Sequence, residues 1–516
     1  MDYKNLDACA SYDALKSLEK RSLKDLLCKE RIEKASIYAG GGLNYNFASM
    51  PVDKSIVSAL KALFEEQGLI EKYKALLSGQ VMNPGEKRLV LHQLTRGQCL
   101  DQDVNQDGEN KRAFYEGELL KIKEFSNKVR NGEILSASGK KFDTVCQIGI
   151  GGSDLGPRAL YLALTGTVEN RIDAKFISNV DPDDAAGVME TINPETTLFI
   201  LVSKSGTTLE TLTNRDLVFS TLKGIDPSKQ LVAVTSKTSP LAKSKDVLAS
   251  FFIDDYIGGR YSSTSAVGAV VLSVALGFDT FSQLLEGAHE ADLLALNEDL
   301  SSNAAAMDAL IGVYLRNVLE LPTTAILPYS QQLSRFPAHL QQLDMESNGK
   351  HVSRDGEKLS YVTGPVIFGE PGTNGQHSFF QLLHQGTDTV PLQFIGFKNS
   401  QFKKDVIIED STSQVKLNAN LVAQIVAFAL GKADENTNKE FDGDRFSSLL
   451  YADELTAKSL GALLAHYENK VMFQGFVWNL NSFDQEGVQL GKVLAGKVLA
   501  GCKGDDILKA YSNILI

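Results

Sequence analysis

From residue 142 onward, short runs rich in β-branched and aromatic residues alternate with longer stretches of helical spacing. This alternation is typical of βαβ units, in which helices join parallel strands and cover the faces of a sheet. The pattern therefore predicts two α/β domains, each with a parallel sheet flanked by helices. The first series has five candidate strands, at residues 144–150, 174–180, 197–203, 230–236 and 250–257. The second series has three, at residues 323–330, 365–370 and 389–397.

Length and composition exclude several classes of protein. The 516 residues are about three times a usual domain of roughly 150, so more than one domain is expected. A net charge of -12, with both signs interspersed, argues against a nucleic-acid-binding surface. The five cysteines form no CxxC pair and no Cys/His cluster, so neither a disulfide framework nor a metal site is predicted.

The first twenty residues are polar and mixed in charge, unlike a secretory signal. The longest apolar run, residues 266–276, is shorter than the roughly 18 residues that cross a bilayer. We therefore expect a soluble cytoplasmic protein that does not enter a membrane. Residues 1–111 have mostly helical spacing, and no chemistry stands out in them.

The strand-to-helix turns carry the candidate chemistry, because ligands of open parallel sheets bind outside the carboxyl ends of the strands. The turn after the first strand, GIGGSDLG, brings Gly149, Gly151 and Gly152 together just before a helix that starts near Ser153. This arrangement suits an anion, but it fits neither the dinucleotide pattern nor the P-loop. Glycines here could equally serve to pack the helix tightly on the strand, and the residues alone leave both interpretations open.

The turn after the third strand, SKSGTTLET at 203–211, offers a lysine, a glycine and four hydroxyl groups at the start of a helix, those of Ser203, Ser205, Thr207 and Thr208. Hydroxyls and free N–H groups at a helix N-terminus bind a phosphate dianion well. A helix cap would need only one hydroxyl. The turn therefore predicts phosphate binding, and the lack of a Walker pattern favours a phosphorylated small molecule over a nucleotide.

Three charged or titratable residues in other turns are weaker candidates. Arg260 follows two glycines, so its guanidinium could approach an oxyanion. His377 lies in a Gly/Asn-rich turn before a helix and can exchange protons near neutral pH. Glu346 lies in DMESNGK, before a Ser-Asn-Gly turn, where a solvated loop acid is the ordinary interpretation. Lys492 is one lysine among many.

Six segments, taken in order and at their separations, resemble the glucose-6-phosphate isomerase family over residues 145–492. They are GIGGSDLG, SKSGTT, DYIGGRYSSTSAVG, QQLDMESNGK, GTNGQHSFFQLLHQG and NSFDQEGVQLGK. The chain departs from the family pattern in two places. Glu486 and Gln489 stand where the family usually has Trp and Glu, and Ser205-Gly206 stands where many members have Thr-Phe.

The resemblance implies reversible isomerisation of glucose 6-phosphate to fructose 6-phosphate, in glycolysis and gluconeogenesis, without a metal or cofactor. The ring opens, and a proton then moves between C1 and C2 through a cis-enediolate. Glu346 would be the base and Arg260 would act on the enediolate, while His377 and Lys492 would assist ring opening. The implied substrate-binding residues are Gly152, Ser153, Ser203, Lys204, Ser205, Thr208, Gln342 and Gln485.

The resemblance also implies a homodimer in which His377 enters the active site of the neighbouring subunit. We expect a helical N-terminal region packing on the second domain, two sugar-isomerase domains and a C-terminal arm, at residues 1–115, 116–280, 281–475 and 476–516. Two alternatives remain, namely another sugar-phosphate isomerase on the same fold and a non-catalytic sugar-phosphate-binding regulator. A regulator would keep SKSGTT but would not need Glu346, Arg260 and His377 together.

Overall fold

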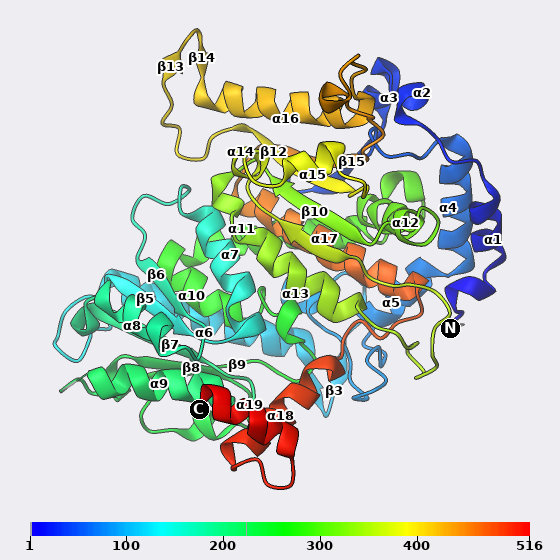
Figure 1. Ribbon diagram of the computed structural model, residues 1–516. Coiled ribbons are helices and arrows are strands. Elements are labelled where there is room, and N and C mark those ends of the chain that lie inside the picture. The colour runs from blue at the N-terminus through cyan, green and yellow to red at the C-terminus, as the bar shows by residue number, and fades with distance from the viewer. Residues whose placement is uncertain (1–2, 223) are drawn as a thin grey trace.

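The computed structural model describes residues 3–222 and 224–516, and two large sheets dominate this part of the chain (Figure 1). The first sheet has five parallel strands in the order β6-β5-β7-β8-β9. They fall on the five segments of the first predicted series. Their bounds are β5 Thr144–Ile148, β6 Asp173–Ile177, β7 Thr197–Val202, β8 Leu231–Thr235 and β9 Ala249–Phe252.

Helices cover both faces of this first sheet, as its sequence pattern requires. Every residue of β7 is buried, and its side chains alternate between two apolar cores. Leu198 and Ile200 face one core, whereas Phe199 and Leu201 face the other. The flanking helices are α6 Lys111–Asn131, α7 Leu155–Leu164 and α10 Ala266–Leu276 on one face, and α8 Pro182–Glu190 and α9 Leu209–Thr221 on the other.

The second sheet has the order β1-β2-β15-β12-β10-β11, with its last four strands parallel. Three of these strands were predicted, and β15 was not. The expectation of α/β architecture with parallel sheets flanked by helices is confirmed. The bounds are β1 Ser36–Gly40, β2 Leu43–Asn46, β10 Thr323–Pro328, β11 Val366–Gly369, β12 Leu392–Asn399 and β15 Ser447–Glu454.

The expectation of a helical N-terminal region is wrong for residues 36–46, which form the antiparallel hairpin β1–β2 and extend the second sheet beyond β15. The glycines of its turn, Gly40 to Gly42, all have positive φ. A Cβ atom on Gly41 would lie 2.5 Å from the carbonyl oxygen of Lys458, so this turn packs directly on α17. The other N-terminal elements are α1 Ala10–Ser17, α2 Leu23–Leu26, α3 Lys29–Lys34, α4 Lys54–Glu66, α5 Leu69–Leu77, β3 Asn105–Gln106 and β4 Glu109–Asn110.

A central helix, α17 (Ala457–Val477), runs through the middle of the molecule, and all its residues except Lys458 are buried (Figure 1). Its buried charges are paired, as burial demands. Lys470 lies 3.1 Å from Asp308, and Glu468 pairs with Arg96. The helices packed around it include α11 Phe278–Leu294, α12 Ala304–Asn317 and α13 Phe336–Asn348. In the described part of the chain, no helix has the length and apolarity needed to cross a membrane.

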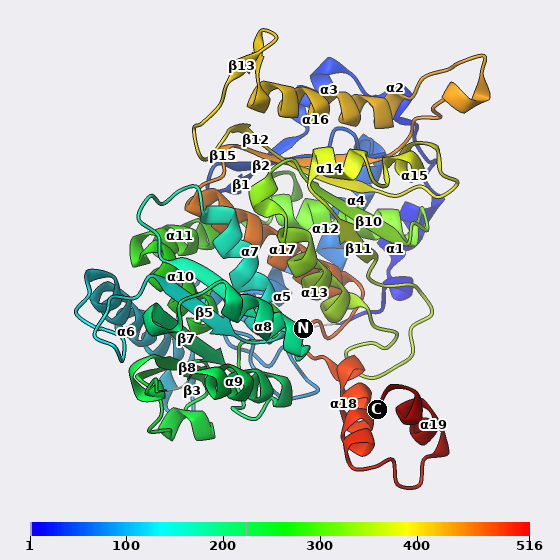
Figure 2. The same ribbon diagram turned by 60° about the vertical axis from the view of Figure 1, so that its left-hand side comes forward.

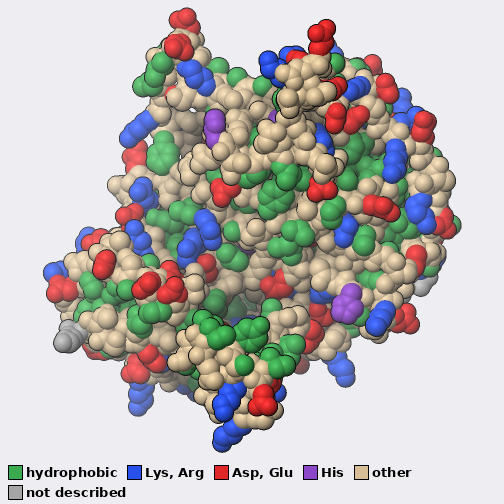
Figure 3. Space-filling model, viewed as in Figure 1, with side chains coloured by type: hydrophobic (Ala, Val, Ile, Leu, Met, Phe, Trp, Pro, Cys, Tyr) green, Lys and Arg blue, Asp and Glu red, His purple; other side chains and the backbone are tan. Residues whose placement is uncertain are grey.

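Two segments leave apolar side chains exposed. Helices α18 (Gln489–Leu499) and α19 (Asp506–Leu515) contain no buried residue and form an arm that projects from the body (Figures 2 and 3). The hairpin of β13 (Ile407–Ile408) and β14 (Ser411–Thr412) projects beside α16 (Ser413–Leu430). The remaining helices are α14 Gly372–Gln376 and α15 Phe380–Gln385.

Candidate active site

A cleft of about 730 Å³ lies at the carboxyl ends of the strands of the first sheet. The turns that follow β5, β7 and β9 form one side of it. The end of α13 and the start of the C-terminal arm form another. The cleft therefore joins both sheets and the arm, and it contains most of the residues expected from the sequence. Those in its lining are Gly152, Ser153, Ser203, Lys204, Ser205, Thr208, Gln342, Glu346, Gln485 and Lys492.

The floor of the cleft is built by close contact between two backbone turns. A Cβ atom on Gly152 would lie only 2.2 Å from the carbonyl carbon of Gly259. A side chain at residue 152 would therefore force the turns after β5 and β9 apart. The glycines of GIGGSDLG are explained here by backbone approach, and that approach brings the chain segment carrying Arg260 to the cleft.

The turn from Ser203 to Thr208 gathers hydroxyl groups at the N-terminus of α9. The hydroxyl oxygens of Ser203 and Thr208 are 3.1 Å apart, and the N–H of Gly206 donates to Ser203 Oγ at 3.1 Å. Thr208 is the residue before α9, yet its side chain makes no capping hydrogen bond. The first N–H groups of an α-helix have no intrahelical partner, so donors remain available for an anion at this point.

Gly206 explains one departure from the family pattern. Its φ is +70°, and a Cβ atom there would lie 2.1 Å from Ser239 Oγ. A phenylalanine at this position would need both a different backbone conformation and a displaced Ser239. The glycine is therefore required by the way this turn packs.

Lys204 is anchored across the cleft rather than free in it. Its Nζ donates to the carbonyl oxygens of Asp255 at 3.3 Å and Ile257 at 3.2 Å. Burial is the main cause that lowers the pKa of Lys204, while Asp255 opposes it. The ammonium group of Lys204 thus links the turn from Ser203 to Thr208 to the segment after β9.

Glu346 lies in the last turn of α13, not in a loop. Its Oε1 accepts a hydrogen bond from Arg260 Nη1 at 3.0 Å, and its Oε2 accepts one from Gln342 Nε2 at 3.0 Å. Gln342 is four residues earlier, one turn along the same face of the helix. The side chain of Glu346 is 24% exposed and lines the cleft. A carboxylate is therefore held in a fixed orientation with access to a ligand.

Arg260 lies behind Glu346 and is not part of the cleft lining. Its side chain is fully buried, and its donors are all engaged. Nε donates to Ser347 Oγ at 2.6 Å and Nη1 also donates to Gln485 Oε1 at 3.2 Å. Nη2 donates to the carbonyl oxygens of Ser482 at 2.6 Å and Asp484 at 2.9 Å. This guanidinium fixes the Glu346 carboxylate to the segment that leads into the arm.

His377 lies outside the cleft formed by its own chain. It follows α14, its side chain is exposed, and within residues 3–222 and 224–516 its ring has no hydrogen-bond partner. Lys492 lies on the first turn of α18 and is exposed, although it lines the cleft. The structure therefore brings together Glu346, Arg260 and Lys492 but leaves His377 apart.

Sequence analysis missed two groups of residues. The first is a wall of the cleft that the N-terminal region forms. It includes Glu86 and Arg88, which belong to none of the motifs described from the sequence. The second is Lys350, whose Nζ bonds to the carboxylate of Asp484 and to the carbonyl oxygen of Asn481. Its place in DMESNGK was the available signal. In the described residues, no group of three or more His, Cys, Asp or Glu side chains could hold a metal ion.

Comparisons with known proteins agree with this geometry. A sequence model of the family described as phosphoglucose isomerase matches residues 46–513. The chain belongs to the phosphoglucose isomerase family.

Relatives in this family are similar over their whole length. The chain is 60% identical to a glucose-6-phosphate isomerase of Treponema denticola, covering 100% of both chains. It is 46% identical to one of Borreliella burgdorferi, covering 100% of this chain and 99% of that one. A crystal structure of a glucose-6-phosphate isomerase from Chlamydia trachomatis superimposes with a TM-score of 0.94 at 43% identity, covering 99% of this chain and 100% of that one.

The second departure from the phosphoglucose isomerase pattern lies at the surface. Glu486 and Gln489 are both exposed at the start of the arm. Neither side chain is therefore part of the apolar core formed by the described residues.

Proposed function

We propose that this protein isomerises glucose 6-phosphate and fructose 6-phosphate, an aldose-ketose interconversion of glycolysis and gluconeogenesis. The observation that best supports this function is the position of the Glu346 carboxylate. It faces the cleft and accepts hydrogen bonds from Arg260 and Gln342 at 3.0 Å each. A base that must serve two adjacent carbons on one face of a substrate needs this fixed, accessible position.

Glu346 is the base of the proposed reaction. Once the sugar ring is open, the C2 proton is acidic because the C1 aldehyde accepts the electrons. Glu346 removes this proton to give a cis-enediolate, and the hydroxyl proton passes from the C2 oxygen to the C1 oxygen. Return of the first proton from Glu346 to C1 then leaves a ketone at C2 and a hydroxyl at C1.

Arg260 stabilises the enediolate as negative charge develops on it. All of its donors are engaged in the protein, and the Nη1 donor that Gln485 accepts is the one next to the cleft. In the proposed complex the enediolate oxygen takes over this donor from Gln485. The other donors keep the guanidinium in place.

The hydroxyl-rich turn holds the phosphate group of the substrate. Ser203, Ser205 and Thr208 supply hydroxyls, and the N-terminus of α9 supplies N–H donors. Lys204 adds positive charge. Gly152 and Ser153 from the turn after β5, with Gln342 and Gln485, complete the proposed contacts with the sugar.

Ring opening requires proton exchange between the C1 hydroxyl and the ring oxygen, and we assign it to Lys492 and to His377 of a second subunit. Two observations support donation across an interface. His377 is exposed and lies outside its own cleft. The arm and the β13–β14 hairpin also expose large apolar side chains, including Leu490 at 68%, Ile507 at 73% and Ile407 at 74%, which a homodimer would cover.

The proposal extends to organisation and location. We treat the chain as four parts, namely an N-terminal region packing on the second domain, two sugar-isomerase domains and an arm, at residues 1–115, 116–280, 281–475 and 476–516. The hairpin β1–β2 pairs with β15 in the sheet of the second domain. This pairing supports the packing of the N-terminal region on that domain. We place the enzyme in the cytoplasm, acting without a cofactor.

The test is a coupled assay in which purified protein forms fructose 6-phosphate from glucose 6-phosphate. Turnover supports the proposal, and sugar-phosphate binding without turnover would favour the non-catalytic regulator instead. The presence of Glu346 and Lys492 in one cleft, with Arg260 bonded to Glu346 from behind, speaks for the enzyme. Parallel assays with other aldose phosphates distinguish this activity from that of another sugar-phosphate isomerase.

A further inference from the structure

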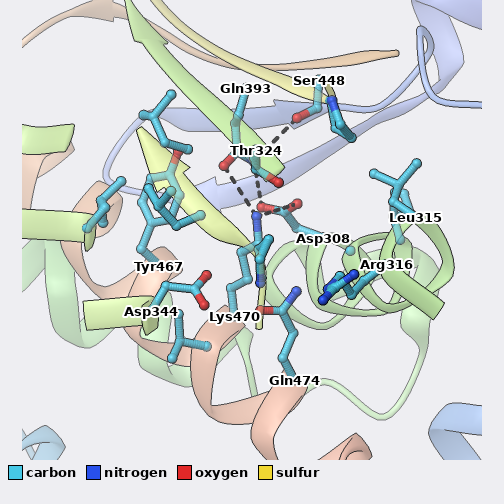
Figure 4. Close-up of a pocket in the computed structure, with 18 of the residues that line it drawn as sticks. Asp308, Leu315, Arg316, Thr324, Asp344, Gln393, Ser448, Tyr467, Lys470 and Gln474 are labelled. Atoms are coloured by element: carbon cyan, nitrogen blue, oxygen red, sulfur yellow. Dashed lines mark hydrogen bonds and ion pairs between the residues drawn. The ribbon is translucent and has the colours of Figure 1, made fainter. Parts of the chain in front are cut away.

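A second, interior cavity lies beneath the helix that carries Glu346 (Figure 4). Its volume is about 40 Å³, room for two or three water molecules at roughly 10 to 15 Å³ each. It is enclosed between α12, α13 and α17 and the face of the second sheet. The polar residues of its lining that matter here are Asp308, Asp344, Gln393, Ser448, Lys470 and Gln474.

One side of this cavity is an ordered charge network. Lys470 Nζ lies 3.1 Å from Asp308 Oδ1 and 3.3 Å from Gln393 Oε1. Asp308 Oδ2 also accepts hydrogen bonds from Gln393 Nε2 at 2.7 Å and is 3.0 Å from His466 Nε2. Burial acts to raise the pKa of Asp308, but Lys470 and His466 outweigh it and bring the pKa to about 2. The network therefore engages the ammonium group of Lys470 with two acceptors.

On the other side of the cavity, two buried acceptor atoms have no hydrogen-bond partner among the described residues. They are Asp344 Oδ1 and Gln474 Oε1. In Figure 4 the Asp344 carboxyl group points toward Lys470, but no bond joins them. Buried acceptors are almost always hydrogen-bonded in folded proteins, by protein groups or by ordered water. A polar cavity of this size beside two such acceptors meets the requirements for ordered water.

Asp344 also has a defined relation to the active site. It lies two residues before Glu346 on α13, and residues two apart on an α-helix point about 200° from each other. Asp344 accordingly faces the interior cavity while Glu346 faces the cleft. Whatever holds the Asp344 side chain fixes the rotation of α13 about its axis, and that rotation sets the distance from Glu346 to Arg260.

We propose that ordered water in this cavity bonds Asp344 to α17, and that Asp344 is thereby a positioning residue for Glu346. The inference rests on the proposed isomerase function, because its effect is on that reaction. The charged and titratable groups that line this cavity with Asp344 are Asp308 and Arg316 of α12 and Tyr467 and Lys470 of α17.

A kinetic test separates positioning from general packing. Asp344→Leu should lower kcat about tenfold or more while KM changes less than about threefold, because the phosphate turn is untouched. Asp344→Asn keeps a polar group of the same shape and should restore kcat to within about threefold of wild type. Ser448→Ala, on the sheet side of the same cavity, is the matched control and should stay within about twofold.

Two readouts make the outcome decisive. Circular dichroism and gel filtration must show that each variant is folded, and an apolar variant that fails is replaced by Asp344→Val. Equal kcat for wild type and the folded apolar variant would overturn the inference.

A high-resolution crystal structure should show water within hydrogen-bond distance of Asp344 and Gln474. A dry cavity there would overturn the inference even if isomerase activity is confirmed. Lack of activity in the wild type would instead reject the proposed function.

Discussion

Arg260 Nη1 donates to Glu346 Oε1 at 3.0 Å, and the same guanidinium holds the carbonyl oxygens of Ser482 and Asp484. These residues lie in three separate segments of the chain, and Arg260 and Asp484 are 224 positions apart. One buried side chain thus fixes the base, the end of α13 and the segment that leads to Lys492. The precision of the site depends on this single residue.

Replacing Arg260 with lysine should therefore cost both activity and stability. A lysine has three donors on one nitrogen and cannot bond to five acceptors arranged around a planar guanidinium. We expect kcat to fall by about 100-fold or more, which is the usual loss when a donor to a developing oxyanion is removed. Steady-state kinetics and thermal unfolding measure the two effects. Wild-type kcat in Arg260→Lys would contradict the proposed role.

The hydroxyls of the turn after β7 should contribute to binding through the phosphate group alone. Ser203→Ala combined with Thr208→Val removes two donors, each worth roughly 1.5 to 3 kcal/mol toward a charged oxygen. Calorimetry should show weaker binding of glucose 6-phosphate and of inorganic phosphate, with little change for unphosphorylated glucose. Thr207→Val is the matched control, since Thr207 lies in the same turn but outside the cleft lining. An equal loss for all ligands would mean that the turn is structural.

Subunit exchange tests whether His377 acts across an interface. His377→Ala and Glu346→Gln should each be nearly inactive alone. In a mixed dimer, one site combines the intact Glu346 of one chain with the intact His377 of the other. Random pairing at equal concentrations gives about half mixed dimers, so activity should recover to about a quarter of the wild-type value per subunit.

The control for that experiment is native mass spectrometry, which must show that mixed dimers have formed. Recovery of activity then places His377 in the neighbouring site. A mixture that contains mixed dimers but stays as inactive as its parents would place His377 in its own chain's site or outside catalysis.

The buried carboxyl group of Asp344 predicts a specific pH dependence of stability. Burial raises its pKa to about 7 in the folded protein, with Asp308 adding to the rise and Lys470 opposing it. Between about pH 4 and pH 7 the unfolded chain loses this proton while the folded protein keeps it. Wild type should therefore lose stability relative to Asp344→Asn as the pH rises, by at most about 1.4 kcal/mol per pH unit, and the difference should be constant above about pH 7.

Chemical denaturation of both proteins at several pH values measures this difference. Subtracting the variant from the wild type removes the contribution of other titrating groups, such as His339, whose pKa burial lowers to about 4. A difference that does not change between pH 4 and pH 7 would show that Asp344 is not buried as described.

Much of the fold could be predicted because its signal is local. The strands of the first sheet are short runs rich in β-branched and aromatic residues between helical stretches, and all five were recognised from this pattern. The hairpin β1–β2 was not, because SIYAG and LNYN are short and their pairing with β15 joins residues about 400 positions apart. Local propensity contains no information about such a partner.

Ten of the residues expected from the sequence line the cleft, but their geometry was not predicted. The position of Glu346 at the end of a helix depends on how α13 ends against Gly349, which the motif does not specify. Arg260 was expected beside the reacting atoms, whereas its position behind Glu346 follows from backbone acceptors at Ser482 and Asp484 that any sequence could supply. The wall of the cleft that contains Arg88 was not predicted, because only tertiary packing brings these residues to the site.

The most direct test of the account is isomerisation in D2O by wild type and by Glu346→Gln, followed by NMR of the products. Proton transfer by one carboxylate through an enediolate predicts partial deuterium incorporation at C1 of the fructose 6-phosphate formed by the wild type, because the proton held by Glu346 exchanges with D2O in some turnovers before it reaches C1. The Glu346→Gln variant should still bind glucose 6-phosphate but turn it over at least about 100-fold more slowly, within the usual range for loss of a general base. Wild-type turnover with deuterium incorporation by Glu346→Gln would contradict the account, because another group would then move the proton.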